Sequence, residues 1–372
     1  LTKADKATRV DAVDYIDTVL AGGSTNIDDA LRTAFQLAGE ADGPAYVVFM
    51  TDGQPTVGEK NSMKIAANAK QELREGTRLF SLGVGHDVNS RLLDKLASIC
   101  LGQTSYVRPG QPIDEAITSL WDRIGAPALT DAKLAIRVDG KEGRIRQIYP
   151  TEMYDLFSGD QLVVVGRYRK PGRLQVRLTG DYLGKEREFT LADELPAKTG
   201  SGRNVFVERL WATRRIGQII DDIDLHGEND ELVDELVSLS KKHGILTPYT
   251  AYLAEERTDL NDGGQIRQAA RSRLRSLSVE SGRDAFQQRS LKGSLKLAER
   301  AAPTQSYRAE DLSAAPTDSF GISAPSSGAR SSESRSAGRD FRGRGNGIAG
   351  GGLGGGRGGF AEMDLMMESE VE

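Results

Sequence analysis

Two short loops carry the residue types that could hold a metal ion. Thr25 follows Gly22-Gly23-Ser24, and Asp52 follows the apolar run Ala45-Tyr46-Val47-Val48-Phe49-Met50. A hydroxyl and a carboxylate are oxygen ligands of the kind that hard cations such as Mg²⁺ prefer. The simpler alternative is that Thr25 caps a helix and Asp52 starts a turn, and residue chemistry alone favours it.

The elements around these loops predict an α/β fold with a parallel sheet. Strands that alternate with helices form such sheets, and ligands bind where the strands end. The apolar run before Asp52 predicts a strand that is buried on both faces. Thr25 and Asp52 are therefore expected at one edge of the sheet. The expected strands are 45–50, 79–85 and 105–107, and the expected helices are 7–20, 27–37, 61–74, 90–99 and 113–124.

A different pattern begins after Pro127. Apolar and polar residues alternate there, which predicts antiparallel strands with one face in water, arranged as a sandwich or part of one. Helices are expected after that, the last of them rich in Arg. The expected strands are 132–138, 145–149, 161–169, 174–178 and 187–191, the expected helices are 205–223, 230–243 and part of 265–302, and 247–253 is expected to be extended.

The last part of the chain is rich in Ser, Ala, Pro, Gly and Arg from Pro303 onward. Such composition buries little apolar surface, so it predicts a disordered tail. Arg342, Arg344 and Arg357 raise the alternative of RNA binding through the tail. With so few Arg residues, a flexible linker is the better interpretation of this tail. Residues 360–367, which are acidic and apolar, are interpreted as a short docking element.

Bulk properties limit the classes of partner. The net charge of -5 over 372 residues does not predict a polyanion as partner of the whole chain. No run of about 18 apolar residues occurs, so no transmembrane segment is predicted. Cys100 is the single cysteine and lies in an apolar run, which predicts a buried, inert thiol. The chain opens on Leu1 within a helical pattern, so its true amino end is expected upstream.

Other candidate residues give weaker signals, and no enzyme is predicted because no nucleophile–base pair is visible. His86, His226 and His243 lack paired metal-ligand spacing. His86 is expected in a surface turn, and His243 at a helix end where a partly charged imidazole is favourable. The acidic cluster Asp221-Asp222-x-Asp224 is interpreted as a solvated helix end.

Several motifs together resemble one protein family. The combination is similar to von Willebrand factor A (vWA) domain proteins of the inter-alpha-trypsin-inhibitor heavy-chain type (VIT/vWA), most narrowly to bacterial relatives. The resemblance covers roughly residues 1–256, and the combination of motifs is specific, although each motif alone is weak. The motifs are residues 22–31, 47–53, 83–89, 120–131, 209–216 and 240–250.

The resemblance implies a metal-ion-dependent adhesion site. In that family an Asp-x-Ser-x-Ser loop, a Thr and an Asp hold the cation, and by position Thr25 matches the Thr and Asp52 the Asp. Ser24 is expected only to support the loop. The Asp-x-Ser-x-Ser loop, the first strand and helix of the domain and a companion domain are expected upstream of Leu1. Mg²⁺, or Mn²⁺ or Ca²⁺, is thus implied for the complete domain, while this piece is expected to bind it poorly or not at all.

These observations predict a protein-binding or adhesion module that recruits an acidic residue of a partner protein. The cell envelope or the extracellular space is implied as location, and no nucleic acid is expected. The alternatives are a metal-independent envelope scaffold and RNA binding through the tail. The predicted regions are 1–125, a partial doubly wound vWA domain; 126–260, a sandwich-like region with a helical segment; and 261–372, an Arg-rich helix with the disordered tail.

Overall fold

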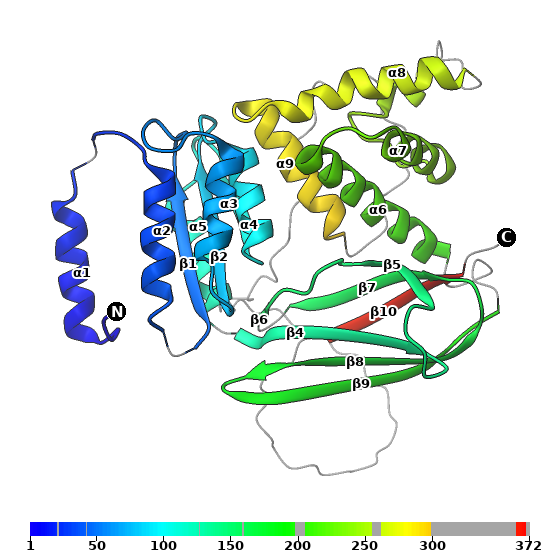
Figure 1. Ribbon diagram of the computed structural model, residues 1–372, viewed down its shortest axis with the longest axis horizontal. Coiled ribbons are helices and arrows are strands. Elements are labelled where there is room, and N and C mark those ends of the chain that lie inside the picture. Colours follow the sequence, from blue (N-terminus) through cyan, green and yellow to red (C-terminus); the bar gives the residue numbers. More distant parts are fainter. Residues whose placement is uncertain are drawn as a thin grey trace, which may run out of the picture.

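The computed structural model in Figure 1 shows a parallel sheet with helices, a β-sandwich and a group of helices that contacts both. The first and the helical units are each built from one stretch of the chain, whereas the sandwich combines a middle stretch with a strand near the end of the sequence. The described residues are 1–20, 22–41, 43–125, 127–157, 160–197, 205–254, 262–298 and 362–369.

The first unit has the predicted alternation of strands and helices. Its sheet has the order β1-β2-β3, and both pairings are parallel. Asn26, Asn61 and Asn89 cap three of its helices through their side-chain oxygens, as short polar residues commonly do. The elements are α1 (Lys6–Thr18), α2 (Ile27–Ala38), β1 (Ala45–Thr51), α3 (Ser62–Glu72), β2 (Thr77–Val84), α4 (Ser90–Ile99), β3 (Gln103–Val107) and α5 (Ile113–Ile124).

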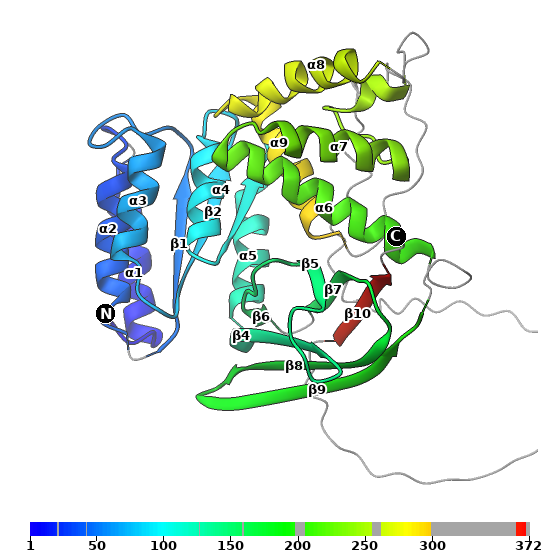
Figure 2. The same cartoon turned by 45° about the vertical axis from the view of Figure 1, so that its right-hand side comes forward.

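Helices cover both faces of this sheet. Leu79 and Phe80 are neighbours on β2, so their side chains point to opposite faces. Leu79 packs into a core formed with α2, α3 and α4, and Phe80 packs against Ile124 of α5. The sheet is thus a doubly wound arrangement, as predicted (Figure 2).

Strand β1 differs from the prediction that it is buried on both faces. Val48 is 40% exposed and Met50 is 54% exposed. Among the described residues β1 pairs with β2 alone, and α1 stands apart with no buried residue (Figure 1). The apolar run therefore predicts the strand correctly, but the prediction that both of its faces are buried is wrong.

The second unit is a sandwich of two sheets, ordered β6-β4-β8-β9 and β10-β7-β5. The prediction of an antiparallel sandwich is confirmed for β4 to β9, whose inward side chains share one apolar core. Strand β10 lies in the segment foreseen as a docking element, and it pairs with β7 in parallel. The strands are β4 (Pro127–Val138), β5 (Ile145–Tyr149), β6 (Leu156–Phe157), β7 (Gln161–Tyr168), β8 (Gly172–Tyr182), β9 (Lys185–Leu195) and β10 (Glu362–Ser369).

The third unit is helical and packs on β7 of the sandwich through a second apolar core. The prediction that residues 247–253 are extended is wrong. The backbone N–H of Thr250 donates to the carbonyl of Thr247 at 3.0 Å, and a short 3₁₀ helix follows this turn. The predicted tail lies mostly outside the described residues. The helices are α6 (Val205–His226), α7 (Asp230–His243), η1 (Ala251–Ala254), α8 (Gly263–Leu274), η2 (Arg275–Ser278) and α9 (Arg283–Lys296).

A buried charge cluster joins α9 to α4 and α6, and it is defined by Asp94, Asp221, Asp224, Arg289 and Lys292. The Lys292 Nζ lies 3.0 Å from Asp94, 3.0 Å from Asp221 and 2.9 Å from Asp224. Asp221 is 5% exposed and Asp224 is 1% exposed. The interpretation of these acids as a solvated helix end is therefore wrong, because cations of α9 cover them.

Candidate functional site

The loops that carry Thr25 and Asp52 are brought together at the carboxyl edge of the parallel sheet. We call residues 52–57 the Asp52 loop. The Thr25 N–H donates to Oγ1 of Thr56 at 2.7 Å, and the Thr56 N–H donates back to the carbonyl of Thr25 at 2.9 Å. The Val57 N–H reaches the same carbonyl at 3.3 Å. These bonds fix Thr25 against the loop that Asp52 begins.

Thr25 does not cap the helix that follows it. The cap of α2 is Asn26, whose Oδ1 accepts from the Asp29 N–H at 3.3 Å. Within the described part of the chain, the Thr25 hydroxyl has no hydrogen bond, and the residue is half-buried. The hydroxyl is therefore available to another ligand.

The Asp52 side chain does not stabilise the turn that starts at this residue. The adjacent Thr51 hydroxyl takes that role and lies 3.3 Å from the Gly53 N–H. The Asp52 side chain is exposed, and no described residue forms an ion pair or a hydrogen bond with its carboxylate. The simpler roles considered for Thr25 and Asp52, helix cap and turn residue, are thus filled by their neighbours Asn26 and Thr51.

The residues at this edge fit a cation in kind but not in number. A hydroxyl and a carboxylate are suitable oxygen ligands, whereas Mg²⁺ takes about six ligands in an octahedral shell. Among the residues that the structure describes, no group of three or more His, Cys, Asp or Glu could hold a metal ion. Two nearby acids are engaged, since Asp28 accepts from Asn68 at 2.9 Å and Asp29 accepts from Asn26 at 2.8 Å.

Sequence reasoning missed a contact from the far end of the chain. The Gln54 Nε2 of the Asp52 loop donates to Oγ of Ser281 at 2.8 Å. Ser281 lies between η2 and α9, more than two hundred positions later in the sequence. Only a Ser-Gly turn signal marks that place, and it does not say which loop the turn contacts.

The histidines are placed apart from one another. His86 lies in the loop after β2, where its ring stacks edge-on against Phe286 with centroids 5.8 Å apart. His226 is exposed at the end of α6. His243 lies in the last turn of α7, but burial lowers its pKa, which favours the neutral ring. The predicted position of His243 at a helix end is confirmed.

Cys100 matches its prediction. The side chain is fully buried in the core under α4, and burial raises the pKa of its thiol to about 12. A thiol that stays protonated and out of contact with solvent is a poor nucleophile.

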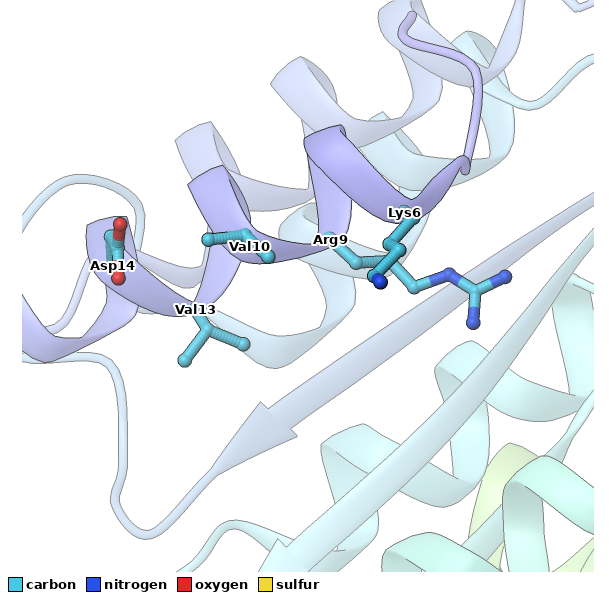
Figure 3. A pocket seen from close by; sticks show the side chains of 5 residues that line it. All are labelled: Lys6, Arg9, Val10, Val13 and Asp14. Carbon is cyan, nitrogen blue, oxygen red and sulfur yellow. The ribbon is translucent and has the colours of Figure 1, made fainter.

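A hollow along α1 does not contribute to this site. Lys6, Arg9, Val10, Val13 and Asp14 line it, all from one helix and all exposed (Figure 3). It has no second wall among these residues and lacks the convergent polar groups of a ligand site.

Comparison with known proteins identifies the first unit. The family model described as von Willebrand factor type A domain matches residues 1–108. Inter-alpha-trypsin inhibitor heavy chain H2 of Sus scrofa is 27% identical over 289 residues, which cover 73% of this chain. The chain contains a vWA domain and is similar to the inter-alpha-trypsin inhibitor heavy chains.

A second curated relative matches a similar share of this vWA protein. Inter-alpha-trypsin inhibitor heavy chain H4 of Homo sapiens is 25% identical over 287 residues, covering 72% of this chain. The chain spans only about 30% of the length of both relatives. A solved structure, von Willebrand factor type A from Catenulispora acidiphila, is 17% identical with a TM-score of 0.45, and each chain is covered to 76%.

No helix in the described residues of this vWA protein has the length and apolar character that a membrane crossing requires. The predicted assignment of Thr25 and Asp52 as metal ligands, and the three predicted regions, remain predictions.

Proposed function

We propose that this vWA protein is a protein-binding or adhesion module whose partner binds at the edge formed by Thr25 and the Asp52 loop. The main support is that adjacent residues, and not Thr25 or Asp52, cap the helix and stabilise the turn. Asn26 caps α2 and the Thr51 hydroxyl makes the turn, so the Thr25 hydroxyl and the Asp52 carboxylate are left for a ligand.

The proposal includes a metal-assisted contact. Asp52 would supply a negative charge and Thr25 a neutral oxygen to a divalent cation, Mg²⁺ or else Mn²⁺ or Ca²⁺. A bound cation would supply positive charge at the edge, which attracts an acidic residue of a partner protein. Since two ligands do not complete an octahedral shell, further ligands must come from other residues or from water. We expect weak cation binding by residues 1–372 alone.

A binding function accords better with the described residues than catalysis does. The one thiol is buried and has a raised pKa, and His86 is stacked on Phe286. Among the described residues of this edge, Thr25 and Asp52 form no nucleophile–base arrangement of the kind that acyl or phosphoryl transfer needs.

Calorimetric titration of the complete gene product with Mg²⁺ tests this site. We expect Asp52→Asn to lower the affinity at least tenfold, which corresponds to about 1.4 kcal/mol. Asp87→Asn is the matched control, because Asp87 is another exposed acid in a loop at the same edge. Equal affinity of wild type and Asp52→Asn would remove Asp52 from the site.

A metal-independent scaffold is the second candidate, because the described residues hold no acidic or His cluster for a metal. Partner binding that is unchanged by EDTA and by Asp52→Asn would favour it.

The RNA-binding alternative concerns Arg342, Arg344 and Arg357, which lie outside the described residues. Deletion of 303–361 removes these Arg residues and keeps strand β10, and RNA binding that survives this deletion would exclude the tail as the RNA-binding site.

We also propose a location in the cell envelope or outside the cell, on the family resemblance. Fractionation of cells that express the complete gene product tests it.

A further inference from the structure

The turn between η2 and α9 lies over the carboxyl edge of the parallel sheet, although it belongs to the helical unit. Figures 1 and 2 both place the junction of α8 and α9 above the ends of β1 and β2. We call residues Val279–Gly282 the clasp. The clasp contacts the Asp52 loop through the hydrogen bond between Gln54 and Ser281.

The clasp is held on one side by α4 and the loop after β2. The Glu280 carbonyl accepts from the Ser90 N–H at 2.9 Å and from its hydroxyl at 3.1 Å. The Asn89 Nδ2 donates to the Glu280 carboxylate at 3.0 Å, and the Gly282 N–H donates to the His86 carbonyl at 2.6 Å. These four hydrogen bonds, made by both backbone and side-chain groups, fix the position of the clasp at the start of α4.

On its other side the clasp holds the Asp52 loop. Ser281 accepts from Gln54, two residues after Asp52, at 2.8 Å. At its far end the same loop is tied to Thr25 through Thr56. The loop therefore has two attachments, one to the Thr25 loop and one to the helical unit.

The position of the clasp depends on α9. The Arg289 Nη2 donates to the carbonyls of Leu277 at 3.0 Å and Val279 at 3.2 Å, which fixes the clasp from below. Lys292 on the same helix belongs to the buried charge cluster, and Phe286 stacks on His86 with centroids 5.8 Å apart. Any movement of α9 would therefore move the clasp as well.

We propose that the clasp couples the docking of α9 to the position of the Asp52 loop, which makes Gln54, Glu280 and Ser281 positioning residues of this edge. With α9 docked, the Asp52 loop is held against Thr25. A ligand that binds the held loop stabilises α9 in turn, because coupling between two sites is reciprocal. The regulatory meaning of this link rests on the proposed adhesion site, but the link itself does not.

Hydrogen–deuterium exchange on the whole chain, without added metal, tests the link. Ser281→Ala removes the acceptor for Gln54, and we expect exchange of the backbone amides of Thr56 and Val57 to rise roughly three- to tenfold, as for loss of one neutral hydrogen bond. Ser278→Ala is the matched control, because its hydroxyl bonds locally to the Arg275 carbonyl. Unchanged exchange at Thr56 and Val57 in Ser281→Ala would overturn the proposal.

A second pair of variants moves the clasp without removing a side-chain bond. Gly282 has φ of +95° and Gly184 has φ of +75°, and an added Cβ meets nothing within 4 Å at either. We expect Gly282→Ala to raise exchange in 52–57, whereas Gly184→Ala in the β8–β9 hairpin leaves it unchanged. A rise confined to 279–290 in Gly282→Ala would contradict the coupling.

Reciprocity gives a third measurement. Thr56→Ala loosens the far attachment of the Asp52 loop, and we expect faster exchange at the Gly282 amide than in wild type. No change there would show that the Asp52 loop does not influence the clasp, which is evidence against the proposal. Since no cation is added in these experiments, their failure is distinct from a failure of the proposed metal site.

Discussion

The buried charge cluster and the Asp52 loop present the same chemical group in opposite settings. Asp221 and Asp224 are enclosed between α6 and α9, with the Lys292 ammonium 3.0 and 2.9 Å away. Asp52 is exposed, and no described residue pairs with its carboxylate. The first two acids are ion-paired within the fold, whereas Asp52 is left for solvent or a ligand.

The difference shows how a carboxylate acquires a structural or a binding role. A buried acid must be paired, because an unpaired buried charge costs several kcal/mol. An exposed acid has no such requirement, so its removal affects binding more than folding. Changes in the two regions should therefore differ strongly in their effect on the free energy of unfolding.

The largest expected effect comes from breaking the cluster. Lys292→Met leaves Asp94, Asp221 and Asp224 without their shared cation, and we expect a loss of about 3–5 kcal/mol in unfolding free energy. Urea denaturation followed by circular dichroism measures it. Lys242→Met is the control, since Lys242 pairs with Glu208 on the surface, where a pair contributes about 0–1 kcal/mol. Equal losses in both would contradict the structural role of the cluster.

A smaller effect is expected from Asp221→Asn. The variant loses charged contacts to Lys292 and Lys296, at about 1.5–3 kcal/mol near pH 7. Asp222→Asn is the neighbouring control, because Asp222 accepts only from Gln218 among the described residues. A result in which Asp222→Asn costs as much as Asp221→Asn would speak against the special position of Asp221.

The cost of Asp221→Asn should also depend on pH. Burial by itself would raise the pKa of Asp221, but the attraction of Lys292 and Lys296 outweighs burial and lowers it. The contribution is therefore present above the unfolded pKa of about 3.9 and is lost as pH falls through the lower folded pKa. We expect the difference between wild type and Asp221→Asn to shrink below about pH 4 when both are unfolded by urea.

At the edge, the effects on folding should be small. Thr56→Ala removes the acceptor of the Thr25 N–H. Because this hydrogen bond is exposed, we expect the unfolding free energy to fall by only about 0.5–1 kcal/mol. Thr56→Ser keeps the hydroxyl and should restore most of that loss. If Thr56→Ser is as unstable as Thr56→Ala, then the methyl group rather than the hydrogen bond is responsible.

The smallest effect is expected from Asp52→Asn in the presence of EDTA. Since no described residue pairs with this carboxylate, the unfolding free energy should change by less than about 0.5 kcal/mol. A large loss in the same urea assay would place Asp52 among the structural acids and would remove the contrast with the cluster.

Much of the fold could be predicted from the sequence, because its signals are local. The apolar spacing in α2 and the run before Asp52 identified their elements, and the family resemblance was confirmed by the match to residues 1–108. Local patterns do not report distant partners. Asp221 looked like a solvated acid because its cation, Lys292, follows 71 positions later in the chain.

The same limit applies to the candidate site. The sequence placed Thr25 and Asp52 at strand and helix ends, and parallel topology put those ends at one edge. It could not show that Asn26 rather than Thr25 caps α2, because both residue types are suitable caps. It also could not show that Gln54 contacts Ser281, since that contact depends on how α9 docks.

The pairing of β10 with β7 has a consequence for synthesis on the ribosome. β7 ends at Tyr168 and its parallel neighbour begins at Glu362. At a translation rate of about 5–20 residues per second, this neighbour emerges roughly 10–40 s after β7. Until then β7 has an unpaired edge next to Leu162 and Val164, the kind of edge on which nascent chains associate. Chaperone binding to the nascent chain should therefore be most needed during that interval.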